Sequence, residues 1–255
     1  KRWTQNCEEE RLLGVSLTGI MDSTLTNGKD NGLEERLERL RDVAVETNKL
    51  HAEAIGIPQS AAVTCVKPSG TVSQLVDSAS GIHARHNPYY IRTVRADKKD
   101  PLAKAMVEAQ FPVEDDVMKP EHTYVFSFPM KADPGAVFRT DMTAIEQLEL
   151  WLKYQMHWCE HKPSVTITVK EHEWMEVGAW VYANWDWMSG VSFLPISDHT
   201  YRQAPYQDCT KEEYEEFKTK MPGEVNWAEL LSQFETTDMT EGAQELACVA
   251  GNCEI

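Results

Sequence analysis

The sequence is poor in cysteine, has fewer basic than acidic residues and contains no long apolar run. Six cysteines among 255 residues are too few for a disulfide scaffold, and no export signal is recognisable, so we expect a reducing, cytoplasmic setting. A membrane span needs about 18 consecutive apolar residues, and no stretch approaches that length. The formal net charge of −16 disfavours binding along a nucleic-acid backbone, because its phosphates carry the same sign.

Alternating short apolar runs and amphipathic segments predict an α/β fold with a largely buried sheet. The clearest strand is 164–169, SVTITV, and the clearest helix is 33–55, which Gly56 and Pro58 follow. Residues 12–20, which contain two glycines, are expected to form a buried strand or a strand that leads into a helix. Other strands are expected at 61–66, 89–94, 124–130 and 191–196, and other helices at 101–110, 143–158, 171–182, 211–220 and 227–234. Periodicity does not decide between a barrel and an open sheet.

Residues 61–73, AAVTCVKPSGTVS, are predicted to form a strand, a tight turn and the start of a helix. The run from Ala62 to Val66 is apolar and rich in β-branched residues, as in strands buried on both faces. Pro-Ser-Gly-Thr then ends the strand. Because the first N–H groups of a helix have no partners within it, the turn and its hydroxyls predict a site for phosphate or another anion.

A simpler interpretation of the same turn is that Ser69 or Thr71 only caps the helix. An anion site would need positive charge nearby, because the chain as a whole is acidic. Six basic residues near the turn could supply it: Lys67, Arg85, Arg92, Arg95, Lys98 and Lys99. The turn alone names no function.

From residue 235 onward the periodicity fades, and small and acidic residues predict a flexible tail. The tail carries Cys248 and Cys253 in the sequence CVAGNC. Two thiols on a flexible segment can close a disulfide and exchange electrons with a disulfide elsewhere. The alternatives are a metal site, for which the tail offers no histidine, or two cysteines without a function.

Five segments resemble the large catalytic chain of ribonucleotide reductases, and most of all the adenosylcobalamin-dependent (class II), thioredoxin-coupled ribonucleoside-triphosphate reductases. The segments are VKPSGTVSQL, SGIHARHNPYYIR, SGVSFLP with YRQAPYQ, and CVAGNCEI. The resemblance covers essentially the whole chain and implies the C-terminal third of such an enzyme. The implied fold is a ten-stranded α/β barrel, with residues 1–234 supplying its later strands and helices and residues 235–255 forming a flexible redox tail.

The resemblance also implies a reaction and residue roles. The reaction would be the radical conversion of ribonucleoside triphosphates to 2′-deoxyribonucleotides, with adenosylcobalamin as cofactor. Cys248 and Cys253 would re-reduce the active-site disulfide after each turnover, with thioredoxin as reductant. The substrate's phosphates would be held by Ser69, Gly70, Thr71, Val72 and Ser73. No cofactor-binding residue of this chain is implied.

One part of the family's pattern is missing. In the family, the radical cysteine and the general-base glutamate lie on an Asn-Pro-Cys-Gly-Glu loop, and no such run occurs here. Cys7, in QNCEEER, lies in a different context and receives no radical role. Because the chain also starts without Met, we expect a fragment or one half of a split enzyme, which needs a companion chain for activity.

Two histidine-containing motifs also suggest metal binding. His157, Cys159 and His161, in HWCEH, end an amphipathic helix, where packing is favoured and no metal site is expected. His83 and His86, in HARH, are interpreted as polar lining near the turn, because the resembled family binds cobalamin without a protein histidine.

The aromatic residues are expected to pack rather than to carry radicals. Tyr89 and Tyr90 would point to opposite faces of a strand, which disfavours a stacked radical relay. Six tryptophans are expected in the core and between helices and sheet: Trp151, Trp158, Trp174, Trp180, Trp185 and Trp187.

Two other functions stay open at this point. The iron-dependent class of the same superfamily shares the tail motif. A non-catalytic nucleotide-binding or thiol-carrier module could have kept the turn and the tail without the remaining chemistry.

Overall fold

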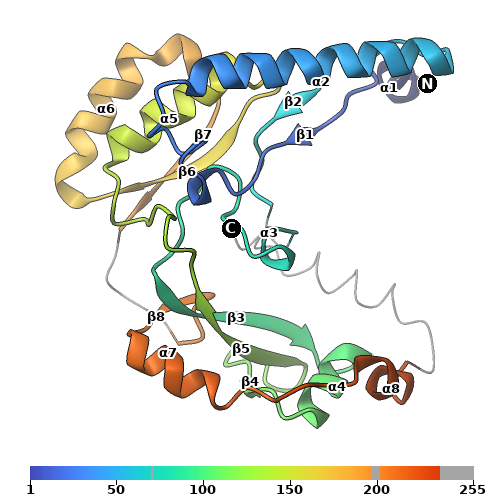
Figure 1. Ribbon diagram of the computed structural model, residues 1–255, viewed down its shortest axis with the longest axis vertical. Coiled ribbons are helices and arrows are strands. Elements are labelled where there is room, and N and C mark those ends of the chain that lie inside the picture. The colour runs from blue at the N-terminus through green and yellow to red at the C-terminus, as the bar shows by residue number, and fades with distance from the viewer. Residues whose placement is uncertain (70–71, 197–201, 236–255) are drawn as a thin grey trace. The chain divides into compact units, whose positions relative to one another are not determined.

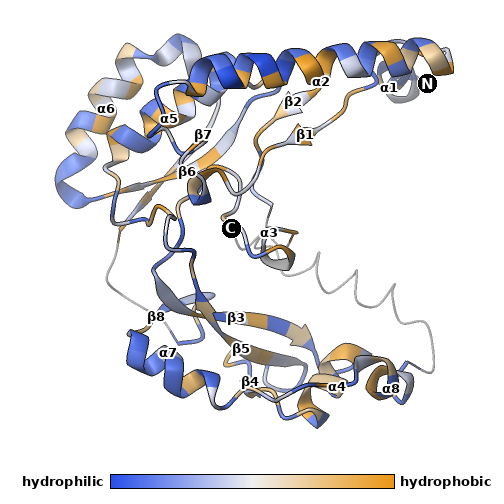
Figure 2. Cartoon of the chain, in the orientation of Figure 1, coloured by the Kyte–Doolittle hydropathy of each residue, from blue (hydrophilic) through white to orange (hydrophobic). Residues whose placement is uncertain are grey.

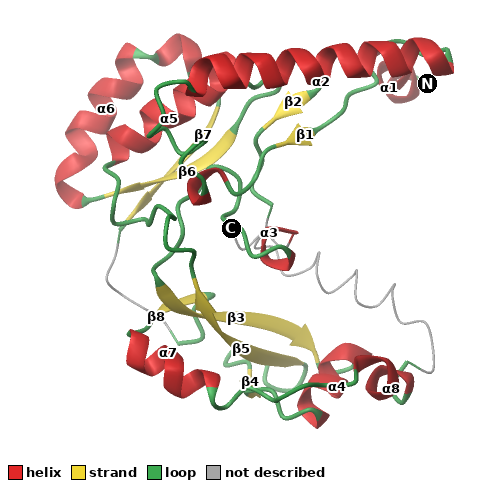
Figure 3. Ribbon diagram, viewed as in Figure 1, coloured by secondary structure: helices red, strands yellow, loops and turns green. Residues whose placement is uncertain are grey.

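The computed structural model describes residues 1–69, 72–196 and 202–235. They form two compact units (Figure 1). The first unit contains Lys1–Arg85 and Asp133–Ile196, and the second contains His86–Ala132 and the described part of Ser197–Ile255. Both units combine helices with strands, which confirms the expected α/β class (Figure 3).

The first unit contains two separate two-stranded parallel sheets, each formed by one short ladder. Its strands are β1 (Val15–Ser16), β2 (Thr64–Cys65), β6 (Ser164–Val169) and β7 (Gly190–Pro195). Strand β1 pairs with β2, and β6 pairs with β7. Immediately after β2, the carbonyl oxygen of Val66 accepts a hydrogen bond from the N–H of Ser164 at 2.9 Å. This bond connects the two ladders.

The helices of the first unit are α1 (Arg2–Glu10), α2 (Leu33–Ile55), α3 (Val72–Leu75), α5 (Ala144–His157) and α6 (Trp174–Ala183), with 3₁₀ turns η1 (Ile20–Asp22), η2 (Glu171–Glu173) and η3 (Trp185–Trp187). Helix α5 begins with a capping box, in which Thr143 and Glu146 each accept a hydrogen bond from the other's backbone N–H. The sequence predicted α2 to the residue and α5 to within one residue at each end. Helix α1 was not predicted.

The core of the first unit lies between β6, α5 and the start of α2. Strand β6 buries every second residue, as its strict alternation predicts, and Ile167 is fully buried. On α5, Leu148 and Trp151 are fully buried, and Trp151 Nε1 donates to the carbonyl oxygen of Pro163 at 3.2 Å. Leu37 of α2 completes the same cluster. Val66, directly after β2 and before the predicted turn, belongs to the same cluster, so burial of these side chains also holds the end of β2 in place.

Helix α2 is only partly covered. Leu33 and Leu37 are buried, whereas Leu40, Leu50 and Ile55 are exposed. Figure 2 shows apolar residues along the half of α2 that is nearer its C-terminus. The amphipathic pattern therefore predicted the helix correctly but overestimated how much of it packs against the described residues.

Of the two alternatives expected for residues 12–20, the buried strand is wrong for most of the segment, whereas a strand that leads into a helix agrees with β1 followed by η1. Only Val15 and Ser16 pair as a strand, and Leu12, Leu13 and Val15 are exposed. Gly19 has a φ of +69° and caps η1, so the backbone turns at this residue and does not stay extended.

The second unit is built on an antiparallel sheet in the order β4-β5-β3-β8. Its elements are β3 (Tyr89–Asp97), α4 (Pro101–Glu108), β4 (Val113–Asp115), β5 (Thr123–Lys131), β8 (Tyr206–Asp208), α7 (Lys211–Lys218) and α8 (Trp227–Ser232). Strands β3 and β5 pair along their full length, from Tyr89 opposite Lys131 to Asp97 opposite Thr123. The sequence predicted the positions of β3 and β5. It did not predict β4, β8 or the antiparallel pairing.

Tyr89 and Tyr90 point to opposite faces of β3, as predicted. The ring of Tyr89 lies 5.2 Å from that of Tyr214 on α7. Tyr90 is buried, and its ring lies 5.8 Å from that of Tyr206 on β8. The two tyrosines therefore do not stack on each other.

The expected burial of the six tryptophans holds for part of the set. Trp151 and Trp158 are buried, but Trp174, Trp185 and Trp187 are exposed. The exposed residues lie on α6 and η3, which carry apolar residues on several sides, so one side faces solvent whichever side packs.

In the described part of the chain, no helix combines the length and the apolarity that a membrane crossing requires.

Candidate functional site

The predicted anion-binding turn lies between β2 and α3 in the first unit. Of its five predicted residues, Gly70 and Thr71 lie outside the described residues. Ser69 is partly buried, and Val72 and Ser73 open α3, which is four residues long. The expected order of strand, turn and helix is therefore confirmed for the described part.

Two backbone N–H groups of the turn already have acceptors. The N–H of Ser69 donates to Ser80 Oγ at 3.0 Å, and the N–H of Val72 donates to the carbonyl oxygen of Ser69 at 3.0 Å. The expectation of unpartnered N–H groups is wrong at these two positions, because groups around the turn satisfy them. At Ser69 and Val72, the backbone N–H groups are therefore used within the chain.

The Ser69 hydroxyl is held loosely. Its Oγ lies 3.4 Å from Ser80 Oγ and 3.4 Å from Thr18 Oγ1. A well-formed bond between hydroxyl oxygens is about 2.7–2.8 Å long, so both contacts are weak. This hydroxyl can therefore turn toward a ligand at little cost.

Ser73 presents an unusual hydroxyl. Its side chain is fully buried, and its Oγ has no hydrogen-bond partner in the described structure, although its carbonyl oxygen accepts from the N–H of Ser78 at 2.8 Å. An unsatisfied buried polar group costs about 1–3 kcal/mol. An oxyanion bound at the turn could satisfy this hydroxyl.

Lys67 supplies positive charge directly before the turn. Its side chain is exposed, its Nζ lies 3.3 Å from Ser164 Oγ, and its N–H donates to Ser16 Oγ at 3.1 Å. Because the hydrogen bond to Ser164 is neutral and no ion pair to Lys67 is found among the described residues, the charge of the ammonium group remains available to an anion.

The expected cationic patch is wrong for Arg85. Arg85 is buried and forms ion pairs with Asp22 and Asp77, so two carboxylates offset its charge. The four remaining residues belong to the second unit: Arg92, Arg95, Lys98 and Lys99. Arg95 there pairs with an aspartate. Of the predicted patch, Lys67 is the residue that adjoins the turn in the chain.

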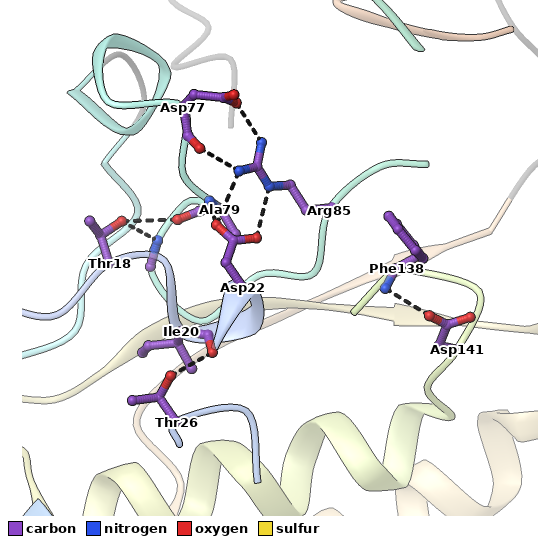
Figure 4. Close-up of polar contacts among 10 residues, drawn as sticks. Thr18, Ile20, Asp22, Thr26, Asp77, Ala79, Arg85, Phe138 and Asp141 are labelled. Carbon is purple, nitrogen blue, oxygen red and sulfur yellow. Dashed lines mark hydrogen bonds and ion pairs between the residues drawn. The ribbon is translucent and has the colours of Figure 1, made fainter. Parts of the chain in front are cut away.

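Arg85 ends a segment, residues 77–85, that we call the return segment because its Ser80 contacts Ser69 of the turn. Figure 4 shows Arg85 between Asp22 and Asp77. Its Nε and Nη2 donate to the two carboxylate oxygens of Asp22 at 2.9 and 3.1 Å, and its Nη1 donates to Asp77 Oδ1 at 2.9 Å. Asp22 Oδ2 also accepts from the N–H of Ala79 at 2.7 Å. The sequence analysis missed this cluster, because Asp22 and Arg85 lie 63 residues apart.

Gly81, in the return segment, packs tightly against the chain before the turn. Its φ is +55°, and a Cβ added there would lie 2.9 Å from the carbonyl oxygen of Lys67. Both the backbone conformation and the space therefore require glycine. The sequence analysis did not single out this glycine.

Comparisons with known proteins bear on the whole chain. No family model matches the sequence. The adenosylcobalamin-dependent ribonucleoside-triphosphate reductase of Euglena gracilis is 31% identical over 257 residues, which cover 98% of this chain and 35% of the relative. The protein of the same name from Lactobacillus leichmannii is 26% identical over 278 residues, which cover 97% of this chain and 37% of the relative.

A solved structure of a B-12 dependent (class II) ribonucleotide reductase matches with a TM-score of 0.77 and 25% identity, over 92% of this chain and 36% of that one. This chain is related to the class II ribonucleotide reductases. The resemblance expected from the sequence is thereby confirmed. The chain spans 35–37% of the length of the curated class II reductases named above.

Neither His83 nor His86 is positioned as a cobalt ligand, and His83 is structural. Nδ1 of His83 lies 3.0 Å from the carbonyl oxygen of Ser80, and its Nε2 accepts from the N–H of Thr166 at 3.0 Å. Burial lowers the pKa of His83, so the ring is neutral at neutral pH. In the second unit, His86 stacks on Tyr206, and its Nε2 lies 2.6 Å from an Asp208 carboxylate oxygen. For His83 this replaces the expected polar lining with a structural role.

The two histidines of the HWCEH motif contact two separate parts of the first unit. His157 Nδ1 lies 2.8 Å from Glu38 Oε1, and His161 Nε2 lies 2.7 Å from the carbonyl oxygen of Leu13. The pKa of the Cys159 thiol is raised to about 12. Burial is the larger cause, and the electrostatic effect of the nearby Cys65 is the second. Within the described ranges, no three His, Cys, Asp or Glu side chains gather as a metal site.

The predicted redox pair, Cys248 and Cys253, lies outside the described residues. The four described cysteines are free thiols. One of them, Cys7, is exposed and lines a pocket of about 560 Å³ between α1 and the end of α2, together with His51 and apolar residues such as Ile55. The Asn-Pro-Cys-Gly-Glu run expected of a class II reductase is absent from this sequence.

Proposed function

We propose that this chain is the part of an adenosylcobalamin-dependent ribonucleotide reductase that binds the phosphates of a ribonucleoside triphosphate. The observation that carries the proposal is the similarity over 97–98% of the chain to reductases of that name. The match to a class II structure over 92% of the chain supports it. The relatives cited are named for the cobalamin class, which favours this class over the iron-dependent one.

The proposed fold is the later part of a ten-stranded α/β barrel. The two parallel ladders, connected by the Ser164–Val66 hydrogen bond, support this proposal because they are compatible with consecutive strands of a closed sheet. Residues 1–234 would belong to the barrel and residues 235–255 to a redox tail.

The phosphates would bind at the turn Ser69, Gly70, Thr71, Val72 and Ser73, next to Lys67. The Ser69 hydroxyl, which makes only long contacts, and the buried Ser73 hydroxyl, which has no partner in the described structure, are the side chains that support this proposal. A triphosphate anchored there would fix the ribose relative to the reacting groups, and such positioning contributes strongly to rate.

The cofactor would be adenosylcobalamin, which supplies the radical when it is bound. The described residues do not provide an identifiable site for it. Both ring nitrogens of His83 are used within the chain, and His86 is engaged by Tyr206 and Asp208. We therefore assign the cobalamin to no residue of this chain and derive no step from it.

Cys248 and Cys253 would act as the redox shuttle. A reduced pair gives up two electrons and two protons, becomes a disulfide and thereby reduces an active-site disulfide to two thiols. Thioredoxin would then reduce the tail disulfide. The sequence spacing CVAGNC supports this role.

The cytoplasmic location inferred from the sparse cysteines stays a prediction.

A companion polypeptide would carry the radical cysteine and the general-base glutamate. The missing Asn-Pro-Cys-Gly-Glu run and the 35–37% coverage of the relatives support this proposal.

The test is an assay of CTP reduction with adenosylcobalamin and reduced thioredoxin. The chain is assayed alone and together with the polypeptide that supplies the remaining two-thirds of a class II reductase. Deoxycytidine triphosphate should form only when both polypeptides and the cofactor are present. No product in the complete mixture, or equal product without cobalamin, would refute the proposal.

A further inference from the structure

We propose that Arg85 is a positioning residue: through Asp22 and the return segment it holds Ser69 in the place where the turn meets a phosphate. This inference rests on the proposed phosphate-binding function and assigns roles to residues outside the turn. Arg85 is 5% exposed, and Asp22 and Asp77 occupy its guanidinium, so it acts through other groups and not by contact with the ligand.

The first step runs from Arg85 to the backbone of Ala79. The guanidinium makes a two-bond fork to the Asp22 carboxylate, and such paired bonds fix orientation as well as distance. Asp22 Oδ2 in turn accepts from the N–H of Ala79 at 2.7 Å. Asp77 holds the other side of the guanidinium through Nη1. The start and the end of the return segment are thereby bound to one charged cluster (Figure 4).

The second step fixes the residues on both sides of Ser80. Thr18 Oγ1 donates to the carbonyl oxygen of Ala79 at 3.0 Å and accepts from the N–H of Gly81 at 2.9 Å. The N–H of Gly19 adds a bond to the same carbonyl oxygen at 2.8 Å. With both of its neighbours held, Ser80 has little freedom to move.

In the third step, Ser80 holds Ser69, the first residue of the turn. Ser80 Oγ accepts the N–H of Ser69 at 3.0 Å, and the two hydroxyl oxygens lie 3.4 Å apart. A displacement of Ser80 would therefore move the first residue of the predicted phosphate site. A ligand would then have to reorder the turn as it binds, which weakens binding.

Two substitutions each remove a different hydrogen bond from the series that links Arg85 to Ser69. Arg85→Lys keeps the positive charge but replaces three planar nitrogens by a single one, so the two parallel bonds to the Asp22 carboxylate and the bond on the opposite side to Asp77 lose their geometry. Ser80→Ala leaves the ion pairs intact and removes the acceptor of the Ser69 N–H. The matched control is Arg36→Lys, because Arg36 also pairs with an aspartate, Asp30 at 2.6 Å, in the same unit. Its other hydrogen bond reaches the carbonyl oxygen of Leu25, outside the return segment.

The first measurement is hydrogen–deuterium exchange of the Ser69 amide in the ligand-free chain. Arg85→Lys and Ser80→Ala should each speed its exchange by about tenfold or more, and Arg36→Lys should leave it unchanged. If Arg85→Lys leaves the exchange of Ser69 unchanged in a folded chain, the inference is wrong, whatever the chain binds.

The second measurement is the dissociation constant of CTP by calorimetry, followed by KM and kcat in the complete reductase. Both variants should raise the dissociation constant and KM by about three- to tenfold, with kcat nearly unchanged, because they disturb ground-state binding. The double variant should cost less than the product of the two single effects, since both act on one set of contacts. Independent, multiplicative effects, or an equal loss of binding in Arg36→Lys, would overturn the inference.

Failure of the proposed function gives a different result. If the unaltered chain and the complete reductase bind no CTP, the phosphate site is refuted, and Arg85 then has no site to position. If the unaltered protein binds CTP and Arg85→Lys binds it equally well, the phosphate site stands and the role of Arg85 is refuted.

Discussion

His83 Nε2 accepts the backbone N–H of Thr166 at 3.0 Å, so the segment after the predicted turn is bound directly to β6. Because Thr166 supplies the donor, Nε2 must be unprotonated, and the proton of the neutral ring lies on Nδ1, which donates to the carbonyl oxygen of Ser80. Protonation of Nε2 would replace an attractive contact by a clash of two donors. The bond therefore exists only with the neutral ring.

This relationship predicts a pH dependence of stability. Burial lowers the pKa of His83 in the folded chain below its ordinary value, about 6.5 in the unfolded chain. As pH falls through about 6.5, the unfolded state takes up a proton first, so the folded state loses stability below that pH and regains it above. Urea unfolding between about pH 5 and 7.5 should show this slope, and His83→Gln should flatten it. His51→Gln, at an exposed position of α2, is the control and should keep the slope.

A second prediction concerns Gly81. Gly81→Ala should destabilise the first unit by about 1–3 kcal/mol, because it combines a positive φ with a Cβ 2.9 Å from the carbonyl oxygen of Lys67. Gly178→Ala, in α6, should instead stabilise by about 0.5–1 kcal/mol, since nothing lies within 4 Å of its added Cβ and alanine favours helix. Thermal unfolding of both variants measures the difference in sign. A neutral Gly81→Ala would contradict the tight approach.

A third prediction separates two buried hydroxyl groups. Neither Ser73 Oγ nor Ser78 Oγ has a partner in the described structure, so replacing either serine by alanine should stabilise the ligand-free chain by about 1 kcal/mol. Only Ser73→Ala should also weaken CTP binding, because Ser73 belongs to the proposed phosphate site and Ser78 does not. Equal affinity of the two variants for CTP would remove Ser73 from that site.

Local patterns in the sequence were sufficient to predict most elements. Helix α2 begins and ends where the apolar spacing and Gly56 indicate, and the alternation of SVTITV gives β6 to the residue. Each of these signals lies within the element that it describes. The strand–turn–helix order around Ser69 was predictable for the same reason.

The surroundings of the turn were not predictable, because they depend on contacts between distant residues. Arg85 carries the charge expected of an anion site, but Asp22, 63 residues away, takes it up. The N–H of Ser69 is satisfied by Ser80, whose position follows from Thr18 and Ala79. A sequence shows which groups carry charge or donors, whereas the fold decides which of them a neighbour has already used.

The last prediction concerns the proposed redox shuttle. In the complete reductase, Cys248→Ser and Cys253→Ser should each allow one turnover and lower the steady-state rate with thioredoxin by about tenfold or more, because the first turnover uses an active-site dithiol that is already reduced. Rapid-quench measurement of the first turnover, set beside the steady-state rate, separates the two effects. Cys7→Ser is the matched control, since Cys7 is an exposed free thiol without a proposed role, and it should change neither quantity. Unchanged steady-state rates in the tail variants would show that thioredoxin reduces the active site without the help of Cys248 and Cys253.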